Sequence, residues 1–151
     1  MSTVRIKVEV NDAALENKLK SLIDDRTMYQ VHNLLAKMCD PYVPMDDEGV
    51  LSQSVEVTPE SVRYTQPYAR YQYYGEVYGP NIPIIENGVV VGWFSPPGKP
   101  KHPTGRPINY SKEKHPLATS KWNEAMMRDH REEFVEQVRN ILRQRARELY
   151  G

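Results

Sequence analysis

The sequence of 151 residues contains a single cysteine, Cys39, which excludes an internal disulfide framework and a cysteine-based zinc ribbon. It has no excess charge of either sign, because 20 Lys and Arg residues balance 20 Asp and Glu residues. A net field that would attract the whole molecule to nucleic acid or to a membrane is therefore absent. The sequence also lacks an apolar run of the roughly 18–20 residues that span a bilayer, and its first residues do not resemble a signal peptide. These absences predict a soluble protein of a reducing cytosol.

Phenylalanine is scarce, with two residues, whereas tyrosine occurs ten times. Most of the aromatic surface therefore carries a hydroxyl group, which suits half-buried interfaces better than a dry core. Twelve prolines are present, and seven of them lie between Pro80 and Pro107. A folded protein accommodates such a stretch as a long loop or arm. The chain length predicts one domain over residues 1–151.

The N-terminal third is predicted to contain a strand and a long helix. Residues 4–10 alternate apolar and polar side chains, which is typical of a half-buried strand. Asn11 or Asp12 offers an N-cap to the helix that follows. Apolar residues recur at helical spacing over residues 15–38, and an interruption of this stripe allows the helix to bend near Asp24.

Two hairpins are predicted in the middle of the chain. The alternation over residues 51–57 resumes after the turn sequence Thr-Pro-Glu-Ser at 58–61, where proline in the second position favours a type I turn. The dipeptide at 87–88 is Asn-Gly between two apolar runs, and it favours a hairpin because both residues tolerate positive φ. Residues 67–75 begin with proline and end with glycine, which favours a short helix, although the tyrosine spacing there also fits a strand.

The C-terminal part is predicted to be an arm followed by a helix. Residues 95–116 are rich in Pro, Gly, Lys and His without periodicity, and they predict an extended proline-rich arm or loop. An apolar stripe over residues 117–149 predicts a long C-terminal helix. The order of elements predicts an α+β fold, in which a small mixed or antiparallel sheet packs against a long N-terminal helix and a long C-terminal helix.

Charge is segregated along the chain although its sum is zero. Residues 40–60 contain six acidic side chains and no Lys or Arg, and residues 99–121 contain six basic side chains and one acidic one. Each segment can simply be solvated surface. Alternatively, copies of the chain packed head to tail would bring one acidic and one basic face together, and such contacts close into rings.

The sequence predicts no catalytic, cofactor-binding or metal site. A metal-dependent hydrolase would need His102 and His115, and it would form only if the arm folded back onto the acidic residues at 46–48. Cys39 ends a predicted helix beside an aspartate, where the negative helix end disfavours a reactive thiolate, so a buried structural role is predicted. Residues 98–106 contain glycine and lysine but not in the order of a phosphate-binding loop.

A DNA-contacting module is an alternative function for the basic segment. The Lys and Arg side chains of residues 99–121 could contact phosphates, and Tyr110 could stack on a base. The segment carries few aromatic residues and the chain as a whole is not basic, which favours DNA contact as a secondary role.

Several sequence blocks resemble those of phage minor capsid and head–tail joining proteins. Residues 42–46 (Tyr-Val-Pro-Met-Asp) with residues 49–55 (Gly-Val-Leu-Ser-Gln-Ser-Val) are similar to one family signature, and residues 67–75 (Pro-Tyr-Ala-Arg-Tyr-Gln-Tyr-Tyr-Gly) to its tyrosine block. Residues 100–106 and 115–122 are similar to the arm and the start of the last helix in the branch found in prophages of Gram-positive hosts. The blocks occur in the family's order over more than half of the chain.

This resemblance implies a structural protein of the phage neck, of the minor capsid or tail completion class, located in the virion. Such proteins form rings, here a hexamer or dodecamer, between the portal-bearing head and the tail, so the implied partners are other copies, the portal or connector, and tail proteins. DNA would pass through the ring, and neither a membrane nor a cofactor is implied. In the wider family the tyrosine block is followed by Gly-Thr and a shorter loop, whereas this chain continues through residues 76–80 into the additional hairpin at 87–88.

The segregated charges and the tyrosines together predict a subunit interface. Its predicted members are Asp46, Asp47, Glu48, Tyr68, Tyr71, Tyr73, Tyr74, Lys99, Lys101, Arg106 and Tyr110. Within it, the acidic residues at 46–48 are predicted to pair with Lys99, Lys101 and Arg106 of the next subunit. A proline-rich arm loses less entropy when a neighbour binds it, which favours this arrangement.

Overall fold

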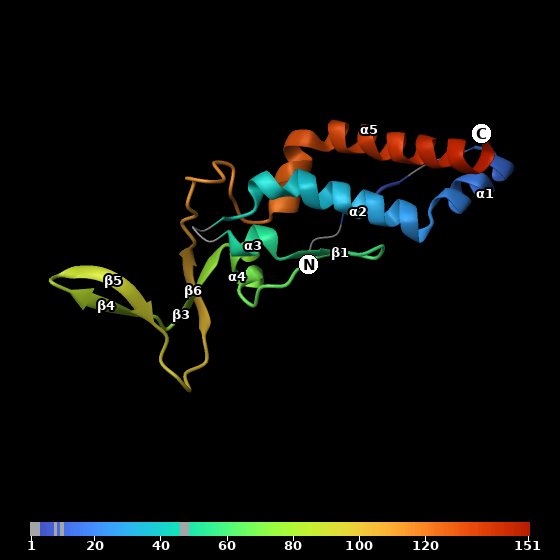
Figure 1. Cartoon of the computed structure of the whole chain (residues 1–151). Coiled ribbons are helices and arrows are strands. Elements are labelled where there is room, and N and C mark those ends of the chain that lie inside the picture. The colour runs from blue at the N-terminus through green and yellow to red at the C-terminus, as the bar shows by residue number, and fades with distance from the viewer. Residues whose placement is uncertain (1–3, 8, 10, 46–48) are drawn as a thin grey trace.

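A computed structural model describes residues 4–7, 9, 11–45 and 49–151 of the chain (Figure 1). In chain order the helices are α1 (Ala13–Leu22), α2 (Asp25–Cys39), the short 3-10 helix η1 (Asp40–Tyr42), α3 (Val50–Gln53), α4 (Ala69–Tyr74) and α5 (Trp122–Tyr150). The strands are β1 (Val55–Val57), β2 (Val62–Tyr64), β3 (Glu76–Gly79), β4 (Ile82–Glu86), β5 (Val89–Phe94) and β6 (His102–Pro107). The predicted α+β class is confirmed.

The molecule is elongated, with α1 and the end of α5 at one end and the β4–β5 hairpin at the other (Figure 1). Helices α2 and α5 run alongside each other, and the β1–β2 hairpin packs against α2. The β4–β5 hairpin projects from the far end beyond the β3–β6 pair. The prediction of one small sheet is wrong, because the described strands form three separate antiparallel pairs: β1–β2, β3–β6 and β4–β5.

The core lies where α2 and α5 meet the segments that follow α2. Phe134 and Met126 of α5 are fully buried there, as is Val43 after η1. Leu51 of α3 is 2% exposed and Trp122 at the start of α5 is 4% exposed. Burial of these side chains is the main favourable contribution to folding.

The predicted N-terminal helix is shorter than expected, since the chain divides it into α1 and α2. The Asp12 carboxylate caps α1 by accepting hydrogen bonds from the backbone N–H groups of Ala14 and Leu15. Asp24 then caps α2, so the expected bend is a complete break at Ile23. An aspartate at an N-cap accepts from the first N–H groups of the helix while its own backbone is extended. Because an extended backbone cannot continue a helix, α1 ends before Asp24 and α2 begins after it.

Two predicted strand segments differ in the structure. The described residues of 4–10 form no strand: Val4 packs against the core while Ile6 is 43% exposed, and residues 8 and 10 lie outside the described part. An alternating pattern gives a strand only where a neighbouring strand satisfies its backbone. Residues 50–53 form α3 instead of a strand, because Gly49 at φ 67° starts a helical turn that buries Leu51.

Both predicted hairpins are confirmed. In the first, Val55 pairs with Tyr64 and the Thr58 N–H donates to the Ser61 carbonyl at 2.9 Å. In the second, Asn87 and Gly88 have φ values of 51° and 80°, as a two-residue hairpin turn requires. Short turns of this kind are determined by the conformations that their own residues allow.

The proline-rich arm is not confirmed as one extended segment. Its residues 102–107 form β6, which pairs with β3 through a bulge between Glu76 and Tyr78. Side chains supplement this pair: Thr104 Oγ1 donates to the Val77 carbonyl at 2.6 Å, and the Gly105 N–H donates to Glu76 Oε1 at 2.8 Å. Prolines are tolerated in β6 because the pair has open edges and a bulge. The predicted C-terminal helix is confirmed as α5, which begins at Trp122 and bends at His130.

Asp24 also ties the start of α2 to the end of α5, and this predicts a pH dependence. The Thr27 backbone N–H at 2.9 Å and the Arg145 guanidinium, with Nε at 3.0 Å, lower the pKa of Asp24 from 3.8 to about 2. The ionised form is therefore favoured in the folded state, so its stabilisation is present above pH 4 and is lost as the pH falls towards 2.

We expect Asp24→Asn to be less stable than the wild type at pH 5 and nearly equal to it at pH 2, because asparagine keeps the cap but not the ion pair. Denaturant unfolding across this pH range measures the difference. A difference that stays constant with pH would show that the charge of Asp24 contributes nothing.

Candidate interaction surfaces

Tyr73 joins α4 to the start of α5. Its hydroxyl donates to Asn123 Oδ1 at 2.9 Å, and its ring lies perpendicular to the Trp122 ring with centroids 5.0 Å apart. Its backbone carbonyl accepts from the Lys121 N–H at 2.8 Å. Among the tyrosines predicted for the subunit interface, Tyr73 is therefore committed to contacts inside its own chain.

Tyr110 holds the segment after β6 against α4. Its hydroxyl donates to the Gln72 carbonyl at 2.5 Å, and burial raises the pKa of Tyr110 to about 12. The Ile108 N–H donates to the Gly75 carbonyl at 2.8 Å beside it. This tyrosine, predicted for an interface or for base stacking, is half-buried and packs internally.

Gly75 ends α4 with φ 74° where the segment around Tyr110 crosses it. A Cβ at this position would lie 2.8 Å from Ser120 Cβ and 3.0 Å from the Tyr110 hydroxyl. We expect Gly75→Ala to lower the free energy of unfolding by about 2–4 kcal/mol, from left-handed strain of about 1–2 kcal/mol plus overpacking.

Gly88 provides the matched control for this prediction. It also has positive φ, at 80°, but a Cβ there would meet nothing within 4 Å. Gly88→Ala should therefore show the conformational cost alone, about 1–2 kcal/mol, in the same denaturant titration. Equal costs at the two positions would mean that the close approach at Gly75 is unimportant.

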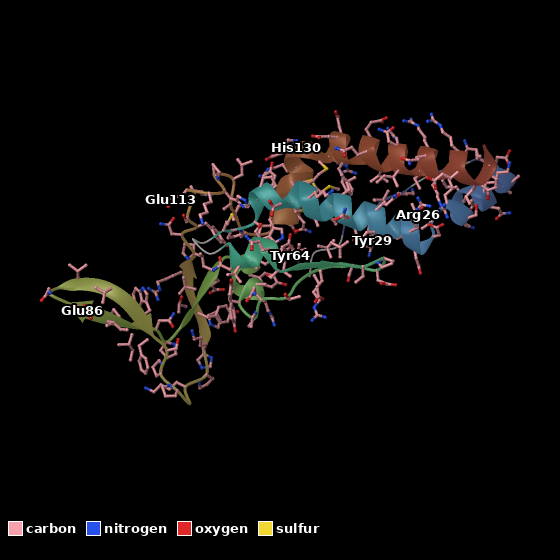
Figure 2. The ribbon with its side chains drawn as sticks, in the orientation of Figure 1. Arg26, Tyr29, Tyr64, Glu86, Glu113 and His130 are labelled. Carbon is pink, nitrogen blue, oxygen red and sulfur yellow. The ribbon has the colours of Figure 1, made fainter. Side chains whose placement is uncertain are left out.

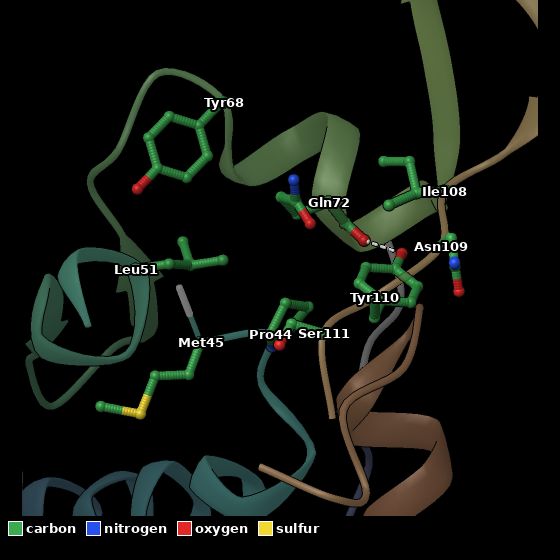
Figure 3. Close-up of a pocket in the computed structure, with 9 residues that line it drawn as sticks. All are labelled: Pro44, Met45, Leu51, Tyr68, Gln72, Ile108, Asn109, Tyr110 and Ser111. Carbon is green, nitrogen blue, oxygen red and sulfur yellow. Dashed lines mark hydrogen bonds between the residues drawn. The ribbon is translucent and has the colours of Figure 1, made fainter. Parts of the chain in front are cut away.

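Tyr68 lines a small hollow of about 160 Å³ between α3, α4 and the segment after β6 (Figure 3). Its described lining residues are Pro44, Met45, Leu51, Tyr68, Gln72, Ile108, Asn109, Tyr110 and Ser111. The figure shows the Tyr68 ring above Leu51, with the Met45 side chain directed away from it. The hollow is thus formed by apolar, amide and hydroxyl groups that pack the tyrosine block onto the core.

Tyr71 and Tyr74 are the two members of the tyrosine block that remain accessible. Tyr71 is 37% exposed and stacks on Tyr78 with ring centroids 4.5 Å apart. Tyr74 is 45% exposed, and the centroid of its ring lies 6.0 Å from the Arg70 guanidinium carbon. These two rings can contact a partner without rearrangement of the chain.

Lys99, Lys101 and Arg106 are all exposed, on and before β6. Lys101 donates from Nζ to Asn81 Oδ1 at 3.1 Å, and none of the three pairs with a carboxylate in the described part of the chain. The acidic residues predicted as their partners, Asp46, Asp47 and Glu48, lie outside the described residues. Lys112, also in the basic segment, donates from Nζ to the Ala118 carbonyl.

The two histidines considered for a metal site lie in different surroundings. His115 Nδ1 lies 2.7 Å from the Val43 carbonyl and Nε2 lies 3.8 Å from Asp40 Oδ2, whereas His102 is exposed on β6. Within residues 4–7, 9, 11–45 and 49–151, no three His, Cys, Asp or Glu side chains are placed to hold a metal ion. Cys39 is 3% exposed and burial raises its pKa to about 12, which confirms the predicted buried role.

The β4–β5 hairpin, which was not among the predicted interface residues, carries many exposed apolar side chains. Its exposed apolar side chains are Ile82, Ile84, Ile85, Val89, Val90, Val91, Trp93 and Phe94. The signal was present in the sequence, since these strands carry apolar residues at consecutive positions and not at every second one. Such runs are typical of strands covered on both faces.

The chain was compared with curated proteins, with solved structures and with models of protein families. No curated protein and no solved structure matches the chain. None of the helices in the described part combines the length and apolar character of a bilayer span. The model of a family described as "Minor capsid protein" matches residues 4–141, which is most of the chain. The chain therefore belongs to the phage minor capsid protein family and is a structural component of the virion.

Proposed function

We propose that this chain is a non-catalytic subunit of the phage neck that joins the head to the tail as a ring of identical copies. The observation that carries the proposal is the exposed apolar β4–β5 hairpin in a member of a capsid family. Trp93, for example, is 61% exposed. Covering such an apolar side chain with a protein partner removes it from water and lowers the free energy of the complex. Identical subunits that expose such surfaces associate into closed symmetric assemblies.

The proposed place in the virion is between the portal or connector and the tail, with DNA passing through the ring. Exposed basic residues on and before β6 support contact with an acidic surface, since Lys99, Lys101 and Arg106 pair with no carboxylate of the described residues. The number of subunits consistent with the family resemblance is six or twelve.

Disruption of this reading frame in the phage or prophage that encodes it tests the proposal. We expect DNA-containing heads and separate tails in electron micrographs, and restoration of complete particles when the wild-type chain is supplied in trans. Complete, infectious particles formed without the chain would contradict a joining role, as would failure of the heads themselves to form.

Reversal of the three exposed basic charges should impair assembly more than folding. The variant Lys99→Glu/Lys101→Glu/Arg106→Glu changes exposed side chains, so its free energy of unfolding should stay within about 1 kcal/mol of the wild type. Its ability to restore complete particles in the disrupted strain should fall strongly, because like charges would face the acidic residues at 46–48 of the next subunit. Normal complementation would show that this pairing is wrong.

DNA contact is the second candidate function, favoured by the same three exposed cations. Binding of duplex DNA to the purified chain should then weaken steeply with salt, since each neutralised phosphate releases counterions. The charge-reversed variant should lose the binding. An electrophoretic shift that is absent at low salt would remove this candidate.

A further inference from the structure

The β4–β5 hairpin is apolar on both of its faces. Strand register places Ile82 opposite Phe94 on one face and Ile85 opposite Val90 on the other, and Trp93 shares the second face. Every residue of β4 is exposed, and so is every residue of β5 except the half-buried Gly92. The hairpin therefore projects from the body with neither face covered (Figure 2).

The size of this surface indicates a protein partner. Its eight large apolar side chains are each 45–63% exposed, so together they present on the order of several hundred Å² of apolar area. Exposed apolar surface of this extent often marks a site of protein–protein interaction. The hairpin carries one charged side chain, Glu86 beside the turn, and no other strand of the described residues pairs with the outer edge of either strand.

Exposed apolar side chains also occur at the opposite end of the molecule, on α1, at its C-cap and at the end of α5 (Figure 1). Leu15 of α1 and its C-cap residue Ile23 are 55% and 51% exposed, and Leu149 and Tyr150 of α5 are 44% and 55% exposed. The Ser21 and Tyr150 hydroxyls are 2.5 Å apart and hold the two helices together. We call these four side chains the α1–α5 end surface.

One cation near the α1–α5 end surface has the opposite sign to the single charge of the hairpin. Lys18 Nζ lies 5.6 Å from the centroid of the Tyr150 ring, and it pairs with no carboxylate of the described residues. Glu86 is the only charged residue of the hairpin. Contact between the two surfaces would bring opposite charges together at the edge of an apolar interface, as specific interfaces commonly do.

We propose that the β4–β5 hairpin of one copy packs onto the α1–α5 end surface of the next copy. The inference rests on the proposed homo-oligomer and specifies its contact. Because the two surfaces differ and lie at opposite ends, the contact is heterologous, and it closes into a ring when the rotation between copies divides a full turn. The partner that covers the hairpin is therefore a second copy of this chain.

A pair of variants, each defective in one surface, tests this contact by analytical ultracentrifugation of the full chain over a concentration series. The hairpin variant is Ile85→Asp/Trp93→Ala and the end-surface variant is Ile23→Asp. The matched control is Leu117→Asp, a 51% exposed aliphatic residue outside both surfaces. Circular dichroism verifies that all three fold.

We expect the wild type and Leu117→Asp to associate alike, and each surface variant to associate roughly 30-fold or more weakly, since central aromatic and aliphatic contacts dominate interfaces. An equimolar mixture of the two surface variants should form dimers and nothing larger, because each retains the surface that the other lost. A monomeric wild type, an unaffected end-surface variant or a mixture that stays monomeric would overturn the inference. If gene disruption still separates heads from tails, such a result removes this contact and leaves the joining role in place.

Discussion

Phe134→Ala is expected to lower the free energy of unfolding by about 3–5 kcal/mol, as is typical of large aromatic deletions in a core. Phe134 is fully buried on α5 within the cluster formed with α2. The substitution removes apolar burial and leaves a cavity that the two packed helices cannot fill. Urea denaturation monitored by circular dichroism measures the change in the midpoint at constant slope.

The second phenylalanine of the chain is the matched control. Phe94 is 49% exposed on β5, so Phe94→Ala should cost less than about 1 kcal/mol of monomer stability, the range of one cross-strand pair. It should instead weaken association between copies. Comparable losses of stability at the two positions would contradict the assignment of Phe134 to the core and of Phe94 to an interface between copies.

Trp122→Ala is expected to have a similar effect, about 3–5 kcal/mol, through a different part of the core. Trp122 is 4% exposed, and the rings of Tyr64 and Tyr73 lie edge-on to it at centroid distances of 5.1 Å and 5.0 Å. Its removal would separate α5 from both the β1–β2 hairpin and α4. Circular dichroism is the suitable probe, because the fluorescence of the variant reports on Trp93 alone.

The other tryptophan again provides the control. Trp93→Ala on the exposed hairpin should change monomer stability by less than about 1 kcal/mol. Trp122→Phe, which keeps an apolar ring between the two tyrosines, should recover a large part of the loss at Trp122. If Trp122→Ala were as mild as Trp93→Ala, the aromatic cluster would not join these elements.

The elements predicted correctly are those that their own residues determine. Asn87 and Gly88 allow the positive φ values of a hairpin turn, and Gly75 allows the left-handed residue that ends α4. Asp24 caps α2 within a few residues of the expected bend. Each of these features depends on backbone conformations and hydrogen bonds that extend over no more than one helical turn.

The elements predicted wrongly depend on a distant neighbour. Residues 102–107 become a strand only because β3 offers them hydrogen bonds, and the prolines among them conceal that capacity. The described residues of the alternating segment at 4–10 pair with no described strand, so their alternation does not produce a strand. Residues 51–53 begin the segment 51–57 that was predicted to alternate, but burial of Leu51 favours a helical turn there.

The predicted interface residues also differ in ways that depend on distant neighbours and not on the local sequence. Sequence alone could not distinguish Tyr73 and Tyr110, which bind their own chain, from Tyr71 and Tyr74, which remain accessible. Consecutive apolar residues such as those of β4 and β5 are typical of covered strands, whereas the fold places them on an exposed projection. Whether a strand is covered is a property of the tertiary arrangement, which a local pattern does not contain.

The number and position of copies in purified virions test the central claim most directly. Quantitative mass spectrometry against a virion protein of known copy number gives the count, and antibody labelling in electron micrographs gives the position. A ring subunit of the neck predicts six or twelve copies per particle, all at the junction of head and tail. Absence of the chain from particles, or copies spread over the capsid shell in proportion to the shell protein, would contradict it.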